Sequence, residues 1–225
     1  MAFDPTRVKA ICFDVDGTLS DTDDNYIARV EKALRGIKLI FPHVNLRPFS
    51  RWLIMVAETP ANAVYHWLDV CSLDDNLARL YEKLIRRRKH IRRPFWLMNG
   101  ANELLADLAQ RYPLSIVSAR DEGSTRQFVE QFALGKFFQT LVCSHTCEHT
   151  KPFAEPVLYA SGQMKISPEN IVMIGDTTVD ILAGKRAGAQ TIGLLCGFGK
   201  EKELLKAGAD LVVKDLVELK EIFAK

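Results

Sequence analysis

Six short apolar runs, most of them separated by stretches with helix-like spacing, limit the fold of this chain more than any other feature. Each run has the length of a buried strand, and strands that alternate with helices form a parallel sheet covered on both faces. We therefore predict an α/β fold with a Rossmann-like parallel sheet and helices on both faces. The predicted strands are residues 8–16, 113–120, 137–144, 170–176, 191–197 and 209–215. The predicted helices are residues 99–112, 121–133, 153–165, 177–188 and 201–207.

One long region, residues 22–94, interrupts this alternation. It has no clear strand, and apolar residues recur at helical spacing in segments such as YIARVEKALRGI and DNLARLYEKLIRRRKH. Inserted after the first strand, such a block predicts a small all-helical cap domain that closes over the carboxyl ends of the strands. The expected domains are a core of residues 1–21 and 95–225 and a helical cap of residues 22–94.

Composition excludes some classes of protein. The chain has 225 residues, 48% of them hydrophobic, which is enough for a core without disulfides or metals to hold it together. A formal net charge of +2 is too small to predict binding to nucleic acid or to a membrane surface. No apolar run approaches the length of a membrane span, and the first ten residues lack the apolar core of a secretory signal. With five cysteines, an odd number, we expect a reducing, cytoplasmic location.

Acidic residues follow two of the predicted strands. Asp14 and Asp16 come at the end of the first strand, and their carboxylates point the same way on an extended backbone. Gly17 permits a tight turn directly after them. Asp176 and Asp180 follow the fourth strand. Because carboxylates crowded at one edge of a sheet repel each other, the pattern predicts a cation there, and Mg²⁺ prefers such ligands together with phosphate oxygens.

Two further polar residues are expected at the same edge. The second strand ends at Ser118, and the third leads to Lys151. A hydroxyl and an ammonium group near the start of a helix would suit a phosphate group.

Four stretches, taken together and in this order, resemble the motifs of the haloacid dehalogenase-like phosphohydrolases. Within that superfamily the sequence is most similar to the phosphoglycolate-phosphatase group, whose helical cap follows the first motif. The resemblance covers nearly the whole chain, and the first and last motifs together are its most specific part. The four stretches are DVDGTLSD (14–21), the apolar strand ending at Ser118, Lys151-Pro152, and GDTTVDILAGKRAG (175–188).

The resemblance implies a role for each residue of these motifs. Asp14 would be the nucleophile that forms an aspartyl-phosphate, and Asp16 would protonate the leaving oxygen and later activate water. Mg²⁺ would be held by the Asp14 carboxylate, the Asp16 backbone carbonyl and Asp176. The remaining motif residues would bind the phosphoryl group (Thr18, Ser118 and Lys151) or support the site (Gly17, Gly175 and Asp180).

The reaction implied is Mg²⁺-dependent hydrolysis of a small phosphate monoester, such as a phosphoglycolate-like compound or a sugar phosphate. An acid at position 16 fits the departure of an alcohol, which needs a proton, better than dehalogenation does. Cap arginines such as Arg35, Arg47 and Arg51 could meet a substrate carboxylate. Three alternatives remain open: a phosphomutase similar to β-phosphoglucomutase, a phosphonatase that uses a cap lysine, and a binding protein without turnover.

Two features of the sequence are not explained by the family's motifs. The tripeptide Ala119-Arg120-Asp121 follows Ser118, where the family more often has a small residue followed by an asparagine, so Arg120 departs from the family pattern. The segment CSHTCEHT (143–150) carries Cys143, His145, Cys147 and His149 at alternate positions. On an extended strand the outer two would lie about 20 Å apart, too far for one tetrahedral zinc. We therefore predict that this segment mainly connects the third strand to Lys151, with Cys143 buried as a small apolar group.

Overall fold

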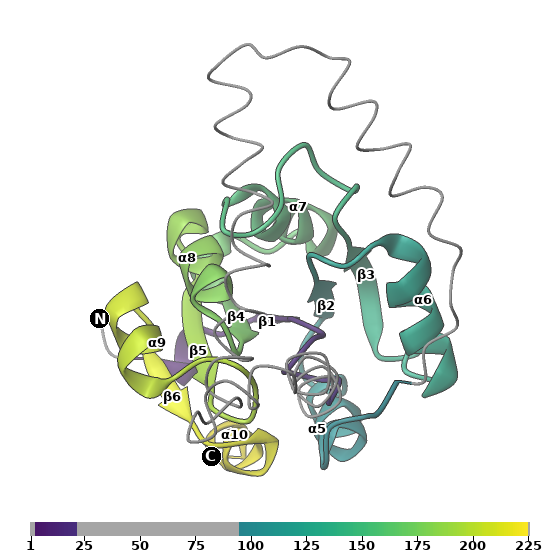
Figure 1. Ribbon diagram of the computed structural model, residues 1–225. Helices are drawn as coiled ribbons and strands as arrows, with labels where there is room; N and C mark the ends of the chain where they lie inside the picture. The colour runs from purple at the N-terminus through teal and green to yellow at the C-terminus, as the bar shows by residue number, and fades with distance from the viewer. Residues whose placement is uncertain (1–2, 22–94, 225) are drawn as a thin grey trace, which may run out of the picture. The chain divides into compact units, whose positions relative to one another are not determined.

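The computed structural model describes residues 3–21 and 95–224, which contain one sheet of six parallel strands (Figure 1). The strands lie in the order β3-β2-β1-β4-β5-β6, and every neighbouring pair is parallel. All six predicted strands are confirmed. Their bounds are β1 Ala10–Phe13, β2 Leu114–Val117, β3 Phe138–Val142, β4 Ile171–Gly175, β5 Gln190–Leu194 and β6 Leu211–Val213.

Six α-helices of the described residues accompany the sheet, and five of them were predicted. The sixth, α10, was missed, although Asp215 caps its first turn by accepting hydrogen bonds from the backbone N–H groups of Val217 and Glu218. The helices are α5 Ala101–Leu108, α6 Glu122–Gln131, α7 Glu155–Met164, α8 Thr178–Ala187, α9 Glu201–Ala207 and α10 Leu216–Phe223, with short 3-10 helices at Pro5–Arg7 and Pro168–Asn170.

Alternation along β1 divides the core into two layers. Ile11 and Phe13 pack on one face, in a cluster that also contains buried residues of α5, α6 and α10. Ala10 and Cys12 pack on the other face, where α7 and α8 cover the sheet. Successive strand residues point to opposite faces, so a strand that is apolar throughout is buried on both sides. The predicted covering of both faces by helices is confirmed (Figure 1).

The strand order determines where a ligand can bind. β1 lies between β2 and β4, so the chain builds the sheet outward from β1 in one direction and then from β4 in the other. In open parallel sheets, ligands bind outside the carboxyl ends of the strands at such a reversal. Residues that directly follow β1 and β4 therefore lie at the favoured place.

The chain divides into two units, residues 1–33 with 95–225 and residues 34–94. The predicted cap of residues 22–94, its arginines Arg35, Arg47 and Arg51, and Cys71 lie outside the described residues, so the cap's helices and boundaries stay predictions. Within the described ranges, no helix has the length and apolar character needed to cross a membrane.

Candidate active site

Three buried carboxylates meet at the carboxyl ends of β1 and β4. Asp14 follows β1, and its backbone N–H donates to the Ile174 carbonyl of β4, which ties the two strand ends together. Asp176 directly follows β4, and Asp180 lies in the first turn of α8. One carboxylate oxygen from each of Asp14, Asp176 and Asp180 lies within 4.8 Å of the other two. The structure thus brings together three of the predicted site residues.

Lys151 lies between two of these acids. Its Nζ donates to Asp14 Oδ1 at 2.5 Å and to Asp180 Oδ1 at 2.6 Å, and the lysine side chain is only 3% exposed. Burial opposes the charged form of the lysine, but the two neighbouring carboxylates outweigh burial and hold the pKa of Lys151 above its usual range. Lys151 is therefore a fixed positive charge beside Asp14.

Asp14 is buried, which is unusual for an acidic side chain. Burial, opposed by Lys151 and reinforced by the charges of Asp180 and Asp16, raises the pKa of Asp14 to about 8. Among the described residues, Asp14, Asp176 and Asp180 outnumber the one ammonium group, that of Lys151, which lies among them. A further cation at this point would offset the excess negative charge and favour the ionised form of Asp14.

Asp180 also organises the start of α8. Its Oδ2 accepts from the backbone N–H of Thr177 at 3.0 Å and from the Thr177 hydroxyl at 2.6 Å. One oxygen of Asp180 therefore accepts hydrogen bonds from Thr177 at the start of α8, and the other accepts from Lys151. The Cβ of any larger residue at Gly175 would lie 2.3 Å from the Asp180 carboxyl carbon, so the predicted supporting glycine keeps room for this acid.

Backbone from two separate turns packs tightly around Asp176. Gly17 has φ +76°, and a Cβ there would lie 2.3 Å from Asp176 Oδ2. A Cβ at Gly197, in the loop after β5, would lie 2.1 Å from the same oxygen. The backbone N–H of Phe198 donates to this oxygen at 2.7 Å. Gly197 and Phe198 were not predicted as site residues; the only signal was a glycine-rich GFGK segment at the end of an apolar run.

Thr18 lies against the same acid. Its hydroxyl donates to Asp176 Oδ1 at 3.4 Å, and its backbone N–H donates to the Val15 carbonyl within the turn. The structure thus places Thr18 beside Asp176 with its amide already used, and its predicted contact with phosphate stays a prediction.

Ser118 begins the loop after β2, next to β1 in the sheet. It is buried, its N–H donates to the Val142 carbonyl, and its Oγ accepts from the backbone N–H of Arg120 at 3.2 Å. The hydroxyl therefore both shapes the loop and keeps a proton to donate. It lies at the sheet edge where the sequence predicted a phosphate contact.

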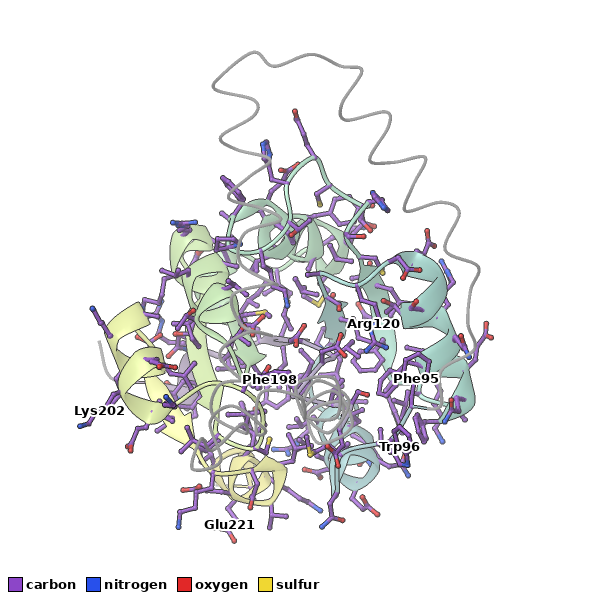
Figure 2. All side chains as sticks on the ribbon, viewed as in Figure 1. Phe95, Trp96, Arg120, Phe198, Lys202 and Glu221 are labelled. Atoms are coloured by element: carbon purple, nitrogen blue, oxygen red, sulfur yellow. The ribbon has the colours of Figure 1, made fainter. Side chains whose placement is uncertain are left out.

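Asp16 is not part of the carboxylate cluster and pairs with Arg120 instead. The guanidinium group donates from Nε to Asp16 Oδ2 at 2.9 Å, and from Nη2 to Asp16 Oδ1. The same guanidinium lies over the ring of Phe95, 4.7 Å from its centroid (Figure 2). Arg120 Nη1 is buried and has no hydrogen-bond partner among the described residues. The residue that departed from the family pattern is thus part of the site.

In the Cys-His segment, no three of the side chains of Cys143, His145, Cys147 and His149 gather at one point. The one group of three or more metal-ligating side chains in residues 3–21 and 95–224 is the aspartate cluster. Cys143 is buried, as predicted, and its N–H donates to the Thr146 hydroxyl. His149 Nδ1 lies 3.0 Å from Glu155 Oε2, and its ring lies 4.8 Å from the Phe153 ring, tilted by 41°. The segment connects β3 to Lys151, as expected.

The donor set at the cluster fits a hard divalent cation. Asp14, Asp176 and Asp180 offer carboxylate oxygens, which Mg²⁺ and similar ions prefer, and neither sulfur nor imidazole lies in the group.

Residues 11–194 match the family of haloacid dehalogenase-like hydrolases. The chain belongs to this family. It is 26% identical to a pyrophosphatase of Oceanobacillus iheyensis, over 94% of this chain and 95% of that protein. It is 28% identical to a phosphoglycolate phosphatase of Chromobacterium violaceum, over 95% of each chain. A solved haloacid dehalogenase-like hydrolase of Streptococcus pneumoniae has the same fold, with a TM-score of 0.69, 22% identity, and coverage of 97% of this chain and 99% of that one. The predicted family and the prediction of an enzyme are confirmed.

Proposed function

We propose that this hydrolase is a Mg²⁺-dependent phosphatase that cleaves a small phosphate monoester through an aspartyl-phosphate on Asp14. One observation carries the proposal most directly: Asp14 is buried at the carboxyl end of the central strand, against Lys151 and within 4.8 Å of two further acids. A nucleophilic carboxylate needs nearby positive charge to accept the dianionic phosphoryl group. Lys151 and a divalent cation would together supply it.

The metal would be held by Asp14 and Asp176, with the Asp16 backbone carbonyl as the third protein ligand expected from the family. Asp180, whose oxygen lies in the same cluster, is a further candidate ligand. When bound, the cation would polarise a phosphoryl oxygen and reduce the repulsion between that group and Asp14.

The protein's own residues would then divide the work. An Asp14 oxygen forms a bond to phosphorus as the bond to the leaving oxygen breaks, and Asp16 gives its proton to that oxygen. Lys151 and the Ser118 hydroxyl hold phosphoryl oxygens in the transition state. In the second half, Asp16 takes a proton from the water that cleaves the aspartyl-phosphate, which releases inorganic phosphate and restores Asp14.

The names of two relatives support a class of substrate. One relative is a pyrophosphatase and another a phosphoglycolate phosphatase, so both act on small anionic phosphates, and we propose the same class here. Phosphoglycolate-like compounds and sugar phosphates are the first candidates. A phosphomutase, a phosphonatase and a binding protein without turnover are the rival outcomes, and a cytoplasmic location stays a prediction.

The test is release of inorganic phosphate from a panel of small phosphate esters and pyrophosphate, with Mg²⁺ and with EDTA. Asp14→Asn is compared with Asp107→Asn, which alters an acid on α5 whose side chain is 40% exposed. We expect release that requires Mg²⁺, disappears in Asp14→Asn and persists in Asp107→Asn. Release that survives Asp14→Asn would remove Asp14 as the nucleophile.

A further inference from the structure

Arg120, two residues after Ser118, pairs with Asp16, and this contact indicates a role for the arginine in the reaction. We propose that Arg120 is a positioning residue, which holds the Asp16 carboxyl group in the orientation from which it transfers its proton to the leaving oxygen. This inference rests on the proposed function, because it concerns the acid of that reaction.

The geometry of the pair fixes the plane of the carboxyl group. Two guanidinium nitrogens donate to two different oxygens of Asp16, a fork-to-fork arrangement that a single donor could not provide. Asp16 is 29% exposed, so its own surroundings leave its side chain more freedom than a buried acid has. The arginine therefore supplies the restraint that burial supplies for Asp14.

Arg120 is itself held at several points. Its backbone N–H donates to Ser118 Oγ, and its carbonyl accepts from the Ser144 N–H. Its guanidinium lies on the Phe95 ring (Figure 2). That ring packs edge to face on Phe128 of α6, with centroids 5.8 Å apart. The arginine side chain is only 13% exposed. A guanidinium restrained by its backbone and by a buried aromatic ring is a rigid support for a partly exposed acid.

The restraint is compatible with the reaction. In the first half, the bond between phosphorus and the leaving oxygen breaks and its electron pair goes to that oxygen, which takes the proton from Asp16. The Asp16 oxygen that carries this proton keeps a lone pair, so both oxygens can still accept from Arg120. The pair therefore orients Asp16 without having to dissociate at each turnover.

If Arg120 orients Asp16, replacing the arginine should lower kcat/KM by a factor that depends on the leaving group. General acid catalysis matters for a leaving group that is a strong base and little for one that departs as a stable anion. Phenyl phosphate and 4-nitrophenyl phosphate differ in this respect but have nearly the same shape. Their kcat/KM values report the steps through phosphorylation of Asp14, so the later attack of water does not enter the comparison.

The experiment compares Arg120→Met and Arg120→Lys with the native enzyme on these two probes. The matched control is Arg126→Met, which removes an exposed arginine of α6 that pairs with Glu122. For Arg120→Met we expect kcat/KM to fall by about 10²-fold on phenyl phosphate, within the contribution of general acid catalysis, and by less than about fivefold on 4-nitrophenyl phosphate. Arg120→Lys keeps a cation over Phe95 but not the fork, and should show a smaller loss with the same leaving-group dependence. Arg126→Met should match the native enzyme on both probes.

Equal losses on the two probes would overturn the inference, because a purely structural role affects both alike. So would an unchanged kcat/KM on phenyl phosphate. If Arg120→Met fails to fold, Arg120→Lys answers the same question. Asp16→Asn distinguishes a failure of the proposed function from a failure of the role of Arg120. A leaving-group-dependent loss in Asp16→Asn, but not in the Arg120 variants, would leave the proposed function standing and remove the role of Arg120.

Discussion

Replacing Gly197 with alanine should damage the site through a single added methyl group. The new Cβ would lie 2.1, 2.4 and 2.5 Å from Oδ2, Cγ and Cβ of Asp176. Non-bonded carbon contacts are optimal at about 3.5–4.0 Å, so the acid or the loop must move by roughly 1 Å or more. That movement would break the 2.7 Å hydrogen bond from the Phe198 N–H to Asp176 Oδ2.

The size of the effect follows from these two losses. Overpacking costs about 1–3 kcal/mol, and a hydrogen bond to a charged group contributes about 1.5–3 kcal/mol. The two overlap, because relieving the clash is what breaks the bond, so we expect Gly197→Ala to lose about 2–4 kcal/mol of unfolding free energy. With a typical urea dependence of about 2 kcal/mol per M, the midpoint should fall by about 1–2 M in EDTA.

Urea unfolding in EDTA and Mg²⁺ titration together check this prediction. Mg²⁺ affinity should fall at least about tenfold, because a displaced Asp176 no longer meets the other ligands. Gly162→Ala is the matched control, since a Cβ there meets nothing within 4 Å, and it should be neutral or slightly stabilising. A Gly197→Ala protein with native stability would refute the packing argument. A destabilised protein that binds Mg²⁺ normally would refute Asp176 as a ligand.

Three further outcomes follow from the same contacts. Lys151→Met leaves Asp14 and Asp180 buried without their shared cation, so in EDTA we expect a loss of about 3–5 kcal/mol by urea unfolding, and a kcat at least about 10²-fold lower. Because the pKa of Asp14 is raised to about 8, the metal-free carboxyl is mostly protonated at pH 7, and Mg²⁺ binding should release close to one proton. Mg²⁺ affinity should therefore rise with pH and level off above about pH 8, and calorimetry in buffers of different ionisation enthalpy should find no such release in Asp14→Asn. Finally, Mg²⁺ at about 100 times its dissociation constant should stabilise the native protein by about 2.7 kcal/mol relative to EDTA, and an unchanged urea midpoint would contradict a site in the folded state.

The sheet, and the proximity of Asp14 and Asp176 at its edge, could be predicted from the sequence for a physical reason. Parallel strands buried on both faces appear as apolar runs, and their carboxyl ends share one edge whatever the details of packing. Asp14 and Asp176 each follow such a run, so their proximity needed no knowledge of side-chain conformations. The missed helix α10 could have been predicted as well, because Asp215 is a favourable N-cap residue and the buried Leu216, Leu219 and Phe223 recur at helical spacing.

The ion pairs could not be read in the same way. Asp16 and Arg120 are 104 positions apart, and Lys151 is 137 from Asp14. Which cation serves which acid depends on rotamers and on loop paths that no local pattern records. Gly197 was equally hidden, since a glycine after a strand indicates a turn but not the acid packed against it.

Two acids in one short motif are thus kept in different surroundings by cations from different strands. Asp14 has a side chain 7% exposed and is held by Lys151, which follows β3. Asp16 has a side chain 29% exposed and is held by Arg120, which follows β2. A nucleophile gains from exclusion of water, because water weakens both its reactivity and the charges that stabilise the transition state. An acid that must give a proton to a departing group, and later take one from water, needs access to both. Neighbouring carboxylates assigned to unlike tasks require unlike environments, and here the separation is achieved by pairing each one with its own cation.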